Sequence, residues 1–228
     1  MSEGILLIDK PTGKSSFYLV SLLRKLTGVR KIGHAGTLDP LATGVMILLI
    51  GSRYTKMSNQ FLSHDKEYLV TVELGATSDS YDADGEITKT DLASEPSPEE
   101  LIHALERFQG EIEQTPPMYS AKKVSGKKLY ELARKGITIE RKAEKITVKT
   151  TLIHYHYPFV ELRIQCSKGT YIRSIAHDLG QILGCGGFVK TLTRTRSGPF
   201  TLEQCVQINT LTKETLPHLC LQTSLAAL

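Results

Sequence analysis

The order of secondary-structure signals in this sequence predicts an α+β fold with a mixed, largely antiparallel sheet flanked by helices. Apolar runs typical of strands and amphipathic stretches typical of helices do not alternate strictly, as they would in a chain of βαβ units. In the second half, the strand-like runs KITVKTTLIHYHY and FVELRIQCS follow each other with no helical stretch between them. Both observations indicate strands that are paired without helical crossovers.

The first half of the chain opens with a short apolar strand over residues 4–8 and a turn at DKPTGK. A helix follows, because Ser15 or Ser16 can cap it and its apolar residues recur at the spacing that buries one stripe. The run GVMILLIG predicts a central strand. The stretch KEYLVTVELG alternates, and it predicts a strand with one buried face formed by Tyr68, Val70, Val72 and Leu74.

The second half contains a strong helix start. Ser97 can cap the helix, Pro98 fits its first position, and Glu100 is placed to reach back to the cap. The remaining predicted elements are the two strands named above, a helix from about Tyr171 to Leu183, and a last strand near 188–194. The stretch TKTDLASEPSP is too short to be a linker between domains.

Length and composition limit the class of protein. With 228 residues, the chain can bury a core without disulfides, as one large domain or two small ones. The four cysteines show no C-x-x-C pair and no metal-ligand spacing with the histidines, so we expect reduced thiols and no zinc site. No apolar run reaches about 18 residues and the start lacks a signal-peptide pattern, so we expect a cytoplasmic protein without a membrane span.

The net charge of +4 is modest, but positive charge is concentrated over residues 119–136, YSAKKVSGKKLYELARKG. This segment has one acidic residue, Glu131, and six basic ones: Lys122, Lys123, Lys127, Lys128, Arg134 and Lys135. Such a concentration is typical of a surface that binds phosphates. A solvated helix face after a Ser-Gly loop explains the segment equally well from charge alone.

Two motifs indicate chemistry that the surrounding residues do not support. Gly13-Lys14-Ser15 resembles the end of a phosphate-binding P-loop, but Ile8 occupies the place of the required glycine. The loop SYDADGEITKTD has the spacing of a calcium loop, yet it begins with Ser80 and follows a strand. We therefore expect neither a nucleotide site nor a metal site, and Asp82 and Asp84 belong to a turn unless one reaches into a site.

The stretch KIGHAGTLDPLATGVM concentrates special residues in one loop. Its glycines allow positive φ and a close approach of the backbone to another molecule, and Pro40 fixes the chain after Asp39. His34 and Asp39 lie between the first and last of these glycines. The pattern predicts a loop that presents Asp39 for chemistry or binding.

GHAGTLDPLATG resembles the signature of the TruB family of tRNA pseudouridine synthases, whose nucleophilic aspartate lies between leucine and proline, as Asp39 does. Further family-like segments occur in the same order and are distributed along residues 4–200: KPTGKSS, KEYLV, SYDADG, QTPPMYSAKKVSGKKLYELARKG, CSKGTYIRSIAHDLG and LTRTRSGPF. One Asp-Pro pair is unspecific because it often just starts a turn, whereas seven ordered segments are specific.

The resemblance implies the pseudouridine synthase fold and an isomerase that converts the T-loop uridine at position 55 of tRNA to pseudouridine. Cleaving the bond from ribose C1′ to N1, rotating the base and rejoining it through C5 oxidises nothing, so no cofactor and no metal is expected. The expected partner is the T arm of tRNA, bound by a monomer that needs no protein partner. The alternative is a non-catalytic tRNA-binding or tRNA-folding module.

The resemblance also implies a catalytic domain over residues 1–200, with the basic segment 119–136 as an insert that clasps the RNA. Residues 201–228 are too short for the RNA-binding PUA-type domain that bacterial members commonly carry. The insert's Lys122, Lys123, Lys127 and Lys128 are expected to contact phosphates.

Site roles follow from the matching positions. Asp39 is the expected nucleophile, and Arg173, in GTYIR, is its expected ion partner that keeps the carboxylate ionised. Tyr68 is expected to pack on the flipped uracil and to take part in proton transfer. The other expected substrate-binding residues are His34 beside the displaced nucleotide, Tyr171 and Leu192 in the base pocket, and Asp82 near it.

Overall fold

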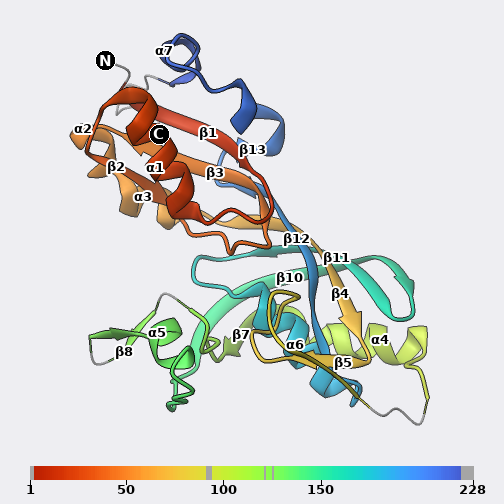
Figure 1. Ribbon diagram of the computed structural model, residues 1–228. Helices are drawn as coiled ribbons and strands as arrows, with labels where there is room; N and C mark the ends of the chain where they lie inside the picture. The colour runs from red at the N-terminus through yellow and green to blue at the C-terminus, as the bar shows by residue number, and fades with distance from the viewer. Residues whose placement is uncertain (1–2, 91–93, 121, 125, 222–228) are drawn as a thin grey trace. The chain divides into compact units, whose positions relative to one another are not determined.

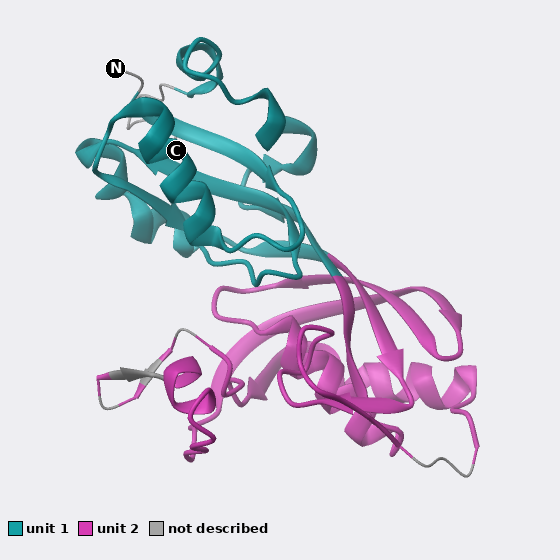
Figure 2. Ribbon diagram, viewed as in Figure 1, with its two compact units in different colours: residues 1–68, 192–228 teal, residues 69–191 magenta. Residues whose placement is uncertain are grey.

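The computed structural model describes residues 3–90, 94–120, 122–124 and 126–221. The chain forms two compact units: residues 1–68 with 192–228 make unit 1, and residues 69–191 make unit 2 (Figure 2). The boundary falls inside two strands, β4 (Lys66–Leu74) and β12 (Gly187–Ser197), so each of these strands contributes residues to both units. None of the described helices combines the length and the apolar character needed to cross a membrane.

The sheet of unit 1 is mixed, as expected, with strand order β14-β1-β3-β12. β1 (Gly4–Lys10) and β3 (Thr43–Ile50) are antiparallel over their whole length, whereas β12 runs parallel to β3 at Thr193 and Arg194. The shorter strands are β2 (Ile32–Ala35), antiparallel to β3, β13 (Phe200–Thr201), antiparallel to β12, and β14 (Val206–Gln207), parallel to β1.

The main helix of unit 1, α1 (Ser16–Thr27), lies along this sheet in Figure 1. Ser15 caps it by accepting a hydrogen bond from the Tyr18 amide, and Gly28, with φ of 72°, ends it. The helix buries Leu19, Val20 and Leu23. The short helices are α2 (Ser52–Thr55), α3 (Ser58–Leu62), α7 (Leu216–Leu219) and the 3₁₀ turns η2 (Leu202–Gln204) and η3 (Ile208–Thr210).

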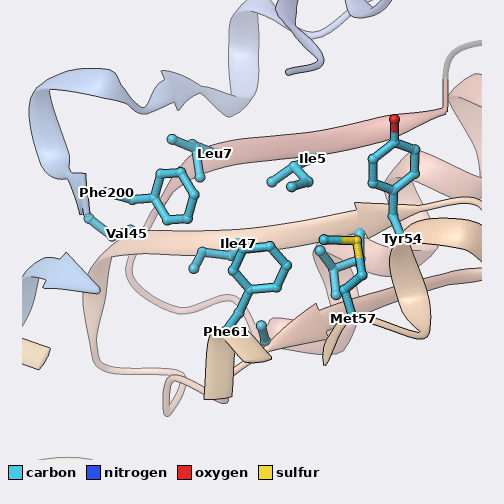
Figure 3. Close-up of a cluster of buried hydrophobic side chains, with 10 residues drawn as sticks. Ile5, Leu7, Val45, Ile47, Tyr54, Met57, Phe61 and Phe200 are labelled. Carbon is cyan, nitrogen blue, oxygen red and sulfur yellow. The ribbon is translucent and has the colours of Figure 1, made fainter. Parts of the chain in front are cut away.

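An apolar cluster joins the sheet of unit 1 to its short helices (Figure 3). Two of its aromatic members, Phe61 and Phe200, lie with their ring centroids 6.0 Å apart, joining α3 to β13. The other buried members are Ile5, Leu7, Ala35, Val45, Ile47, Leu49, Tyr54 and Met57. Because β3 contributes alternate residues to this cluster, the strand that starts at Thr43 is fixed in position and register.

The same ten-stranded sheet continues beyond β12 with the strands of unit 2, in the order β4-β11-β10-β7. β10 (Glu144–His156) is antiparallel to both β11 (Phe159–Cys166) and β7 (Gln109–Gln114). The helices are α4 (Pro98–Leu105), the 3₁₀ turn η1 (Glu106–Phe108), α5 (Leu129–Ala133) and α6 (Ile172–Ile182). Ser97 and Glu100 form the expected capping box at the start of α4.

Two segments of unit 2 fold as hairpins. The SYDADG loop joins β5 (Ala76–Ser78) to β6 (Ile87–Lys89), so it is a hairpin loop and has no helix before it. The basic segment forms the antiparallel pair β8 (Lys123–Val124) and β9 (Lys127–Lys128), followed directly by α5.

Candidate active site

Asp39 lies in the loop that connects β2 to β3. The loop leaves β2 at Ala35, which pairs with Ile47, and enters β3 at Thr43. Asp39 is half-buried, and its carbonyl accepts a hydrogen bond from the Ala42 amide at 3.1 Å, which closes a turn around Pro40. Asp39 lies on a loop, as expected, but that loop begins only at Gly36, because residues 32–35, predicted as part of the loop, form the strand β2 paired with β3.

The buried side chain of Lys10 holds this loop through hydrogen bonds. The side chain of Lys10 is 0% exposed, and its ammonium donates to the carbonyls of Pro11, Lys14 and Pro40 at 2.9, 2.7 and 3.1 Å. The Gly13 amide also donates to the Pro40 carbonyl, at 2.9 Å. A buried ammonium needs an acceptor for each of its three N–H groups, and one of these acceptors is the Pro40 carbonyl. The Lys10 side chain therefore fixes the backbone position of Pro40, the residue after Asp39. The KPTGKSS segment, which contains Lys10 and Gly13, therefore anchors the Asp39 loop by hydrogen bonds.

The residue before Asp39 is fixed by a hydroxyl. Ser16 donates from Oγ to the Leu38 carbonyl at 2.8 Å and accepts from the Leu38 amide at 2.9 Å. Both side chains are buried. Ser16 is the first residue of α1, so the helix and the loop are joined at this point. Asp39 thus lies between two residues whose backbones are held by buried polar side chains.

Arg194 in β12 holds both ends of the same loop. It is 1% exposed, with Nε donating to the Val45 carbonyl at 2.8 Å and Nη2 to the Gly36 carbonyl at 3.2 Å. Gly44 has φ of 101°, and a Cβ there would lie 2.2 Å from the Arg194 carbonyl oxygen. Glycine is therefore required at position 44 because the backbone of the protein's own β12 lies against it, and an approach of this loop to another molecule stays a prediction.

His34 in β2 is half-buried. Burial, and secondarily the charge of Arg194, lowers the pKa of His34 below its ordinary value, so the ring is neutral at pH 7. Its Nδ1 is buried and finds no hydrogen-bond partner among the described residues. Because Nδ1 is enclosed by the protein, that atom does not face a ligand in this structure, and a position of His34 beside the displaced nucleotide stays a prediction.

Tyr68 and Leu192 are both buried, at 8% and 7% exposure, in β4 and β12. Thr195 of β12 donates from Oγ1 to the Glu67 carbonyl at 3.2 Å, so the two strands are bonded close to these residues. Thr43 in turn donates to the Leu192 carbonyl at 3.4 Å. Their roles against a uracil ring stay predictions.

In unit 2, Arg173 near the start of α6 pairs with Asp82. Arg173 Nε lies 3.5 Å from Asp82 Oδ2, Nη1 donates to the Ser80 carbonyl at 2.9 Å and Nη2 to the Tyr119 carbonyl at 2.7 Å. Both charged side chains are buried. The guanidinium therefore joins the SYDADG loop to the start of the basic segment. An ion pair of Arg173 with Asp39 stays a prediction.

Asp82 is itself held in place. Its Oδ1 accepts from Ser80 Oγ at 2.6 Å and from the Asp84 amide at 3.1 Å. Tyr81, with φ of 67°, stacks on His177 at a centroid distance of 3.9 Å. A non-glycine residue with positive φ is costly, and here the stacking and the hydrogen bonds around Asp82 hold it.

Tyr171 precedes α6 and is half-buried. Gln114 holds its backbone with both amide atoms: Oε1 accepts from the Tyr171 amide at 2.8 Å and Nε2 donates to its carbonyl at 3.0 Å. The backbone is fixed, and the phenol ring keeps partial access to solvent. A function in a base pocket stays a prediction.

Among the four lysines expected to bind phosphate, Lys122 forms an ion pair with Glu144 at 2.6 Å. The side chains of Lys123, Lys127 and Lys128 lie outside the part of the structure that is described. Positive charge at Lys122 is thus partly neutralised in the free protein, and a phosphate must compete with Glu144 for it.

No sequence signal indicated a role for Lys10 or Arg194, and Ser16 was considered only as a cap for α1. Each of the three residues belongs to a segment that resembles the family, KPTGKSS or LTRTRSGPF. The neighbouring residues in the sequence do not indicate that its side chain is buried. A Lys-Pro dipeptide just after the first predicted strand and an arginine at the end of the last predicted strand are the weak signals in the sequence.

Two family models match the chain in succession. One is described as TruB family pseudouridylate synthase (N terminal domain) and matches residues 24–172; the other, tRNA pseudouridylate synthase B C-terminal domain, matches residues 173–223. Together with the fold, these matches define the class, a pseudouridylate synthase.

Curated relatives are similar over most of the chain. A tRNA pseudouridine synthase B of Protochlamydia amoebophila (strain UWE25) is 58% identical over 213 residues, covering 92% of this chain and 81% of the relative. Another, of Chlamydia abortus, is 57% identical over 206 residues, covering 90% and 87%. The chain belongs to the TruB family.

Solved structures confirm the pseudouridine synthase fold. A chain of a Cbf5-Nop10-Gar1 complex superposes with a TM-score of 0.72 at 27% identity, covering 92% of this chain and 54% of that one. A chain of an H/ACA RNP bound to a substrate RNA containing 2'-deoxyuridine gives 0.68 at 26% identity, with 91% and 52% covered. The chain spans about half the length of these two structures.

Proposed function

We propose that this chain is an isomerase that converts the uridine at position 55 in the T loop of tRNA to pseudouridine. The observation that carries the proposal is the fixed position of Asp39. Three buried side chains, Lys10, Ser16 and Arg194, hold the backbone of its loop, while Asp39 itself keeps partial access to solvent. Membership of the TruB family, and the names of the curated relatives, support this choice of reaction and substrate.

The reaction needs a carboxylate and no oxidant. The bond between ribose C1′ and N1 of uracil breaks, the base rotates, and C1′ bonds to C5, whose proton leaves while N1 gains one. An ionised Asp39 either attacks as a nucleophile or stabilises positive charge at the ribose, and both roles require a fixed carboxylate. Because the loop is already held by hydrogen bonds, little reorganisation opposes either role.

The base must leave its stack to reach Asp39, and the pocket that receives it is part of the proposal. We assign His34, Tyr68, Tyr171 and Leu192 to the nucleotide, with Asp82 and Arg173 supporting the site. The phosphates of the T arm are bound by Lys122, Lys123, Lys127 and Lys128 of the basic segment. The catalytic domain spans residues 1–200 and acts as a monomer, in the cytoplasm, without a cofactor.

The test is the release of tritium from unmodified tRNA labelled at C5 of its uridines, since substrate and product have the same mass. We expect about one equivalent per tRNA from the native chain, and none from Asp39→Asn or from tRNA whose T-loop uridine is replaced. The matched control is Asp65→Asn, at an exposed position of the same unit. Asp65 accepts a hydrogen bond from the Gly198 amide through its backbone carbonyl, which the substitution preserves, so this variant should keep full activity.

The alternative is a tRNA-binding or tRNA-folding module that does not catalyse. It predicts tight binding of tRNA by the native chain with no tritium release. Asp39→Asn should then change nothing, because a neutral side chain of the same size preserves the surface. Binding measured in parallel for both proteins therefore separates the two functions.

A further inference from the structure

The outer side of α1 and the turn that follows it carry an excess of positive charge. Its five basic members, all exposed, are called here the α1 basic face: Lys14, Arg24, Lys25, Arg30 and Lys31. Between Asp9 and Asp39 the sequence has six basic residues and no acidic one, so this segment is more positive than the whole chain, whose net charge is +4. Within the described part of the chain, none of the five forms an ion pair. An exposed, unneutralised cluster of this kind attracts phosphates.

Two aromatic side chains are exposed beside these cations. Phe17 is 60% exposed and Tyr18 38%, although the buried side of α1 is already filled by aliphatic residues. The Arg24 guanidinium lies 5.7 Å from the Phe17 ring centroid, and the Lys14 ammonium lies 4.9 Å from that of Tyr18. Exposed rings beside cations are the combination with which proteins stack bases and hold the RNA backbone.

The first residue of α1 is hydrogen-bonded to the loop that carries Asp39. Ser16, next to Phe17, is hydrogen-bonded through its hydroxyl to both backbone groups of Leu38. From that point α1 runs for 12 residues, or about 18 Å, to Gly28. Arg30 and Lys31 then lead into β2, which returns to the same loop. The face therefore extends from the site of chemistry over a length of several nucleotides.

We propose that the α1 basic face, with Phe17 and Tyr18, is a second RNA-contact surface, which binds the backbone of the RNA whose uridine reaches Asp39. The inference rests on the proposed function and extends it, because it is separate from the basic segment 119–136. Lys10 takes no part: its ammonium is buried and bonded to three carbonyls. Arg24, Lys25, Arg30 and Lys31 bind phosphates, and Phe17 stacks on a base or ribose.

The test measures the affinity of the full chain for an unmodified T-arm hairpin RNA, by fluorescence anisotropy over a range of salt concentrations. The variant Lys25→Gln/Arg30→Gln/Lys31→Gln removes three charges whose side chains hold nothing else among the described residues. We expect the Kd to rise about tenfold near 0.1 M salt, and the slope of log K against log salt to become shallower by about 2.

A matched control removes the same charge from scattered positions: Lys89→Gln/Lys149→Gln/Lys213→Gln, all exposed. Equal effects of the two triple variants would overturn the proposal, because the loss would then reflect net charge alone. Phe17→Ala, at an exposed position, should weaken binding about fivefold or more with the salt slope preserved.

The outcomes also separate this inference from the proposed function. If the native chain releases tritium but the α1 triple variant binds RNA with unchanged Kd and slope, the function stands and the second surface is rejected. If the native chain releases no tritium but binds the hairpin through the α1 basic face, the surface stands and the catalytic proposal fails.

Discussion

Arg173 and Asp82 form an ion pair in which both side chains are almost completely enclosed, at 5% and 6% exposure, with 3.5 Å between Nε and Oδ2. The pair joins the start of α6 to the hairpin loop between β5 and β6. Since the remaining guanidinium nitrogens donate to the carbonyls of Ser80 and Tyr119, the arginine is positioned by three separate contacts. These contacts of the Arg173 guanidinium hold the hairpin loop between β5 and β6 and the start of the basic segment in one conformation.

Removal of both members of this pair should cost less than the sum of the two single removals. Asp82→Ala leaves the Arg173 charge buried, and we expect a loss of about 3 kcal/mol in the free energy of unfolding. Asp82→Ala/Arg173→Met should lose less than the sum of the two single variants, because no unpaired charge remains. Urea unfolding of all four proteins measures this difference, and strictly additive losses would contradict the pairing.

Replacement of Arg194 should lower turnover more than RNA binding. Arg194→Lys keeps the charge, but one ammonium cannot replace the planar fork that bonds Gly36 and Val45 together. We expect kcat for tritium release to fall by about tenfold to a hundredfold, since a small shift of Asp39 is costly, while KM changes little. Arg196→Lys, two residues along the same strand, is the control and should be close to native in both constants.

Two glycines with positive φ should differ in their tolerance of alanine. At Gly13 a Cβ meets nothing within 4 Å, so Gly13→Ala should cost only the left-handed backbone penalty of about 1 kcal/mol. At Gly44 the Cβ would collide with the backbone of Arg194, which cannot move without opening the sheet. We expect Gly44→Ala to lower the unfolding free energy by at least about twice as much, measured by urea unfolding. Equal losses would show that β12 can move away.

Asp178 provides a pH test with a defined sign. Burial raises its pKa from 3.8 to about 6 in the folded protein. The folded state therefore holds the proton more tightly than the unfolded state. The contribution of Asp178 to stability is complete below about pH 4, and it is lost as pH rises through 6.

Asp178→Asn, which cannot ionise, should thus be more stable than the native chain at pH 7, by about 1 kcal/mol after allowance for its partial exposure. The advantage should vanish near pH 4. Unfolding at both pH values provides the measurement, with the exposed Asp84→Asn as control. A gain that is constant with pH would have another cause.

Local signals predicted the secondary structure well, because they depend on neighbours within a few residues. The capping box of Ser97 and Glu100 and the alternation from Tyr68 to Leu74 are confirmed. The last strand is longer than predicted, 187–197, since its end is fixed by pairing with Thr43 and with Phe200. Such partners cannot be identified from the strand's own residues.

The three side chains that hold the Asp39 loop, those of Lys10, Ser16 and Arg194, were not predictable for the same reason. Sequence left Ser15 and Ser16 as equal candidates for the cap of α1. In the structure Ser15 takes the cap, so the Ser16 hydroxyl is available for Leu38, 22 residues away. Arg194 lies about 150 residues from its acceptors, where no sequence pattern reports a contact. Charge clustering in 119–136 was visible, but its hairpin and the ion pair of Lys122 were not.

The discontinuity of unit 1 along the chain determines when the Asp39 loop is completed during synthesis on the ribosome. Residues 69–191 form one uninterrupted segment, which can fold as soon as it has emerged. Unit 1 must wait, because β12 supplies Arg194 only after that whole segment has been made. A nascent chain therefore carries Asp39 early but unclamped, and translation of LTRTRSGPF completes the loop.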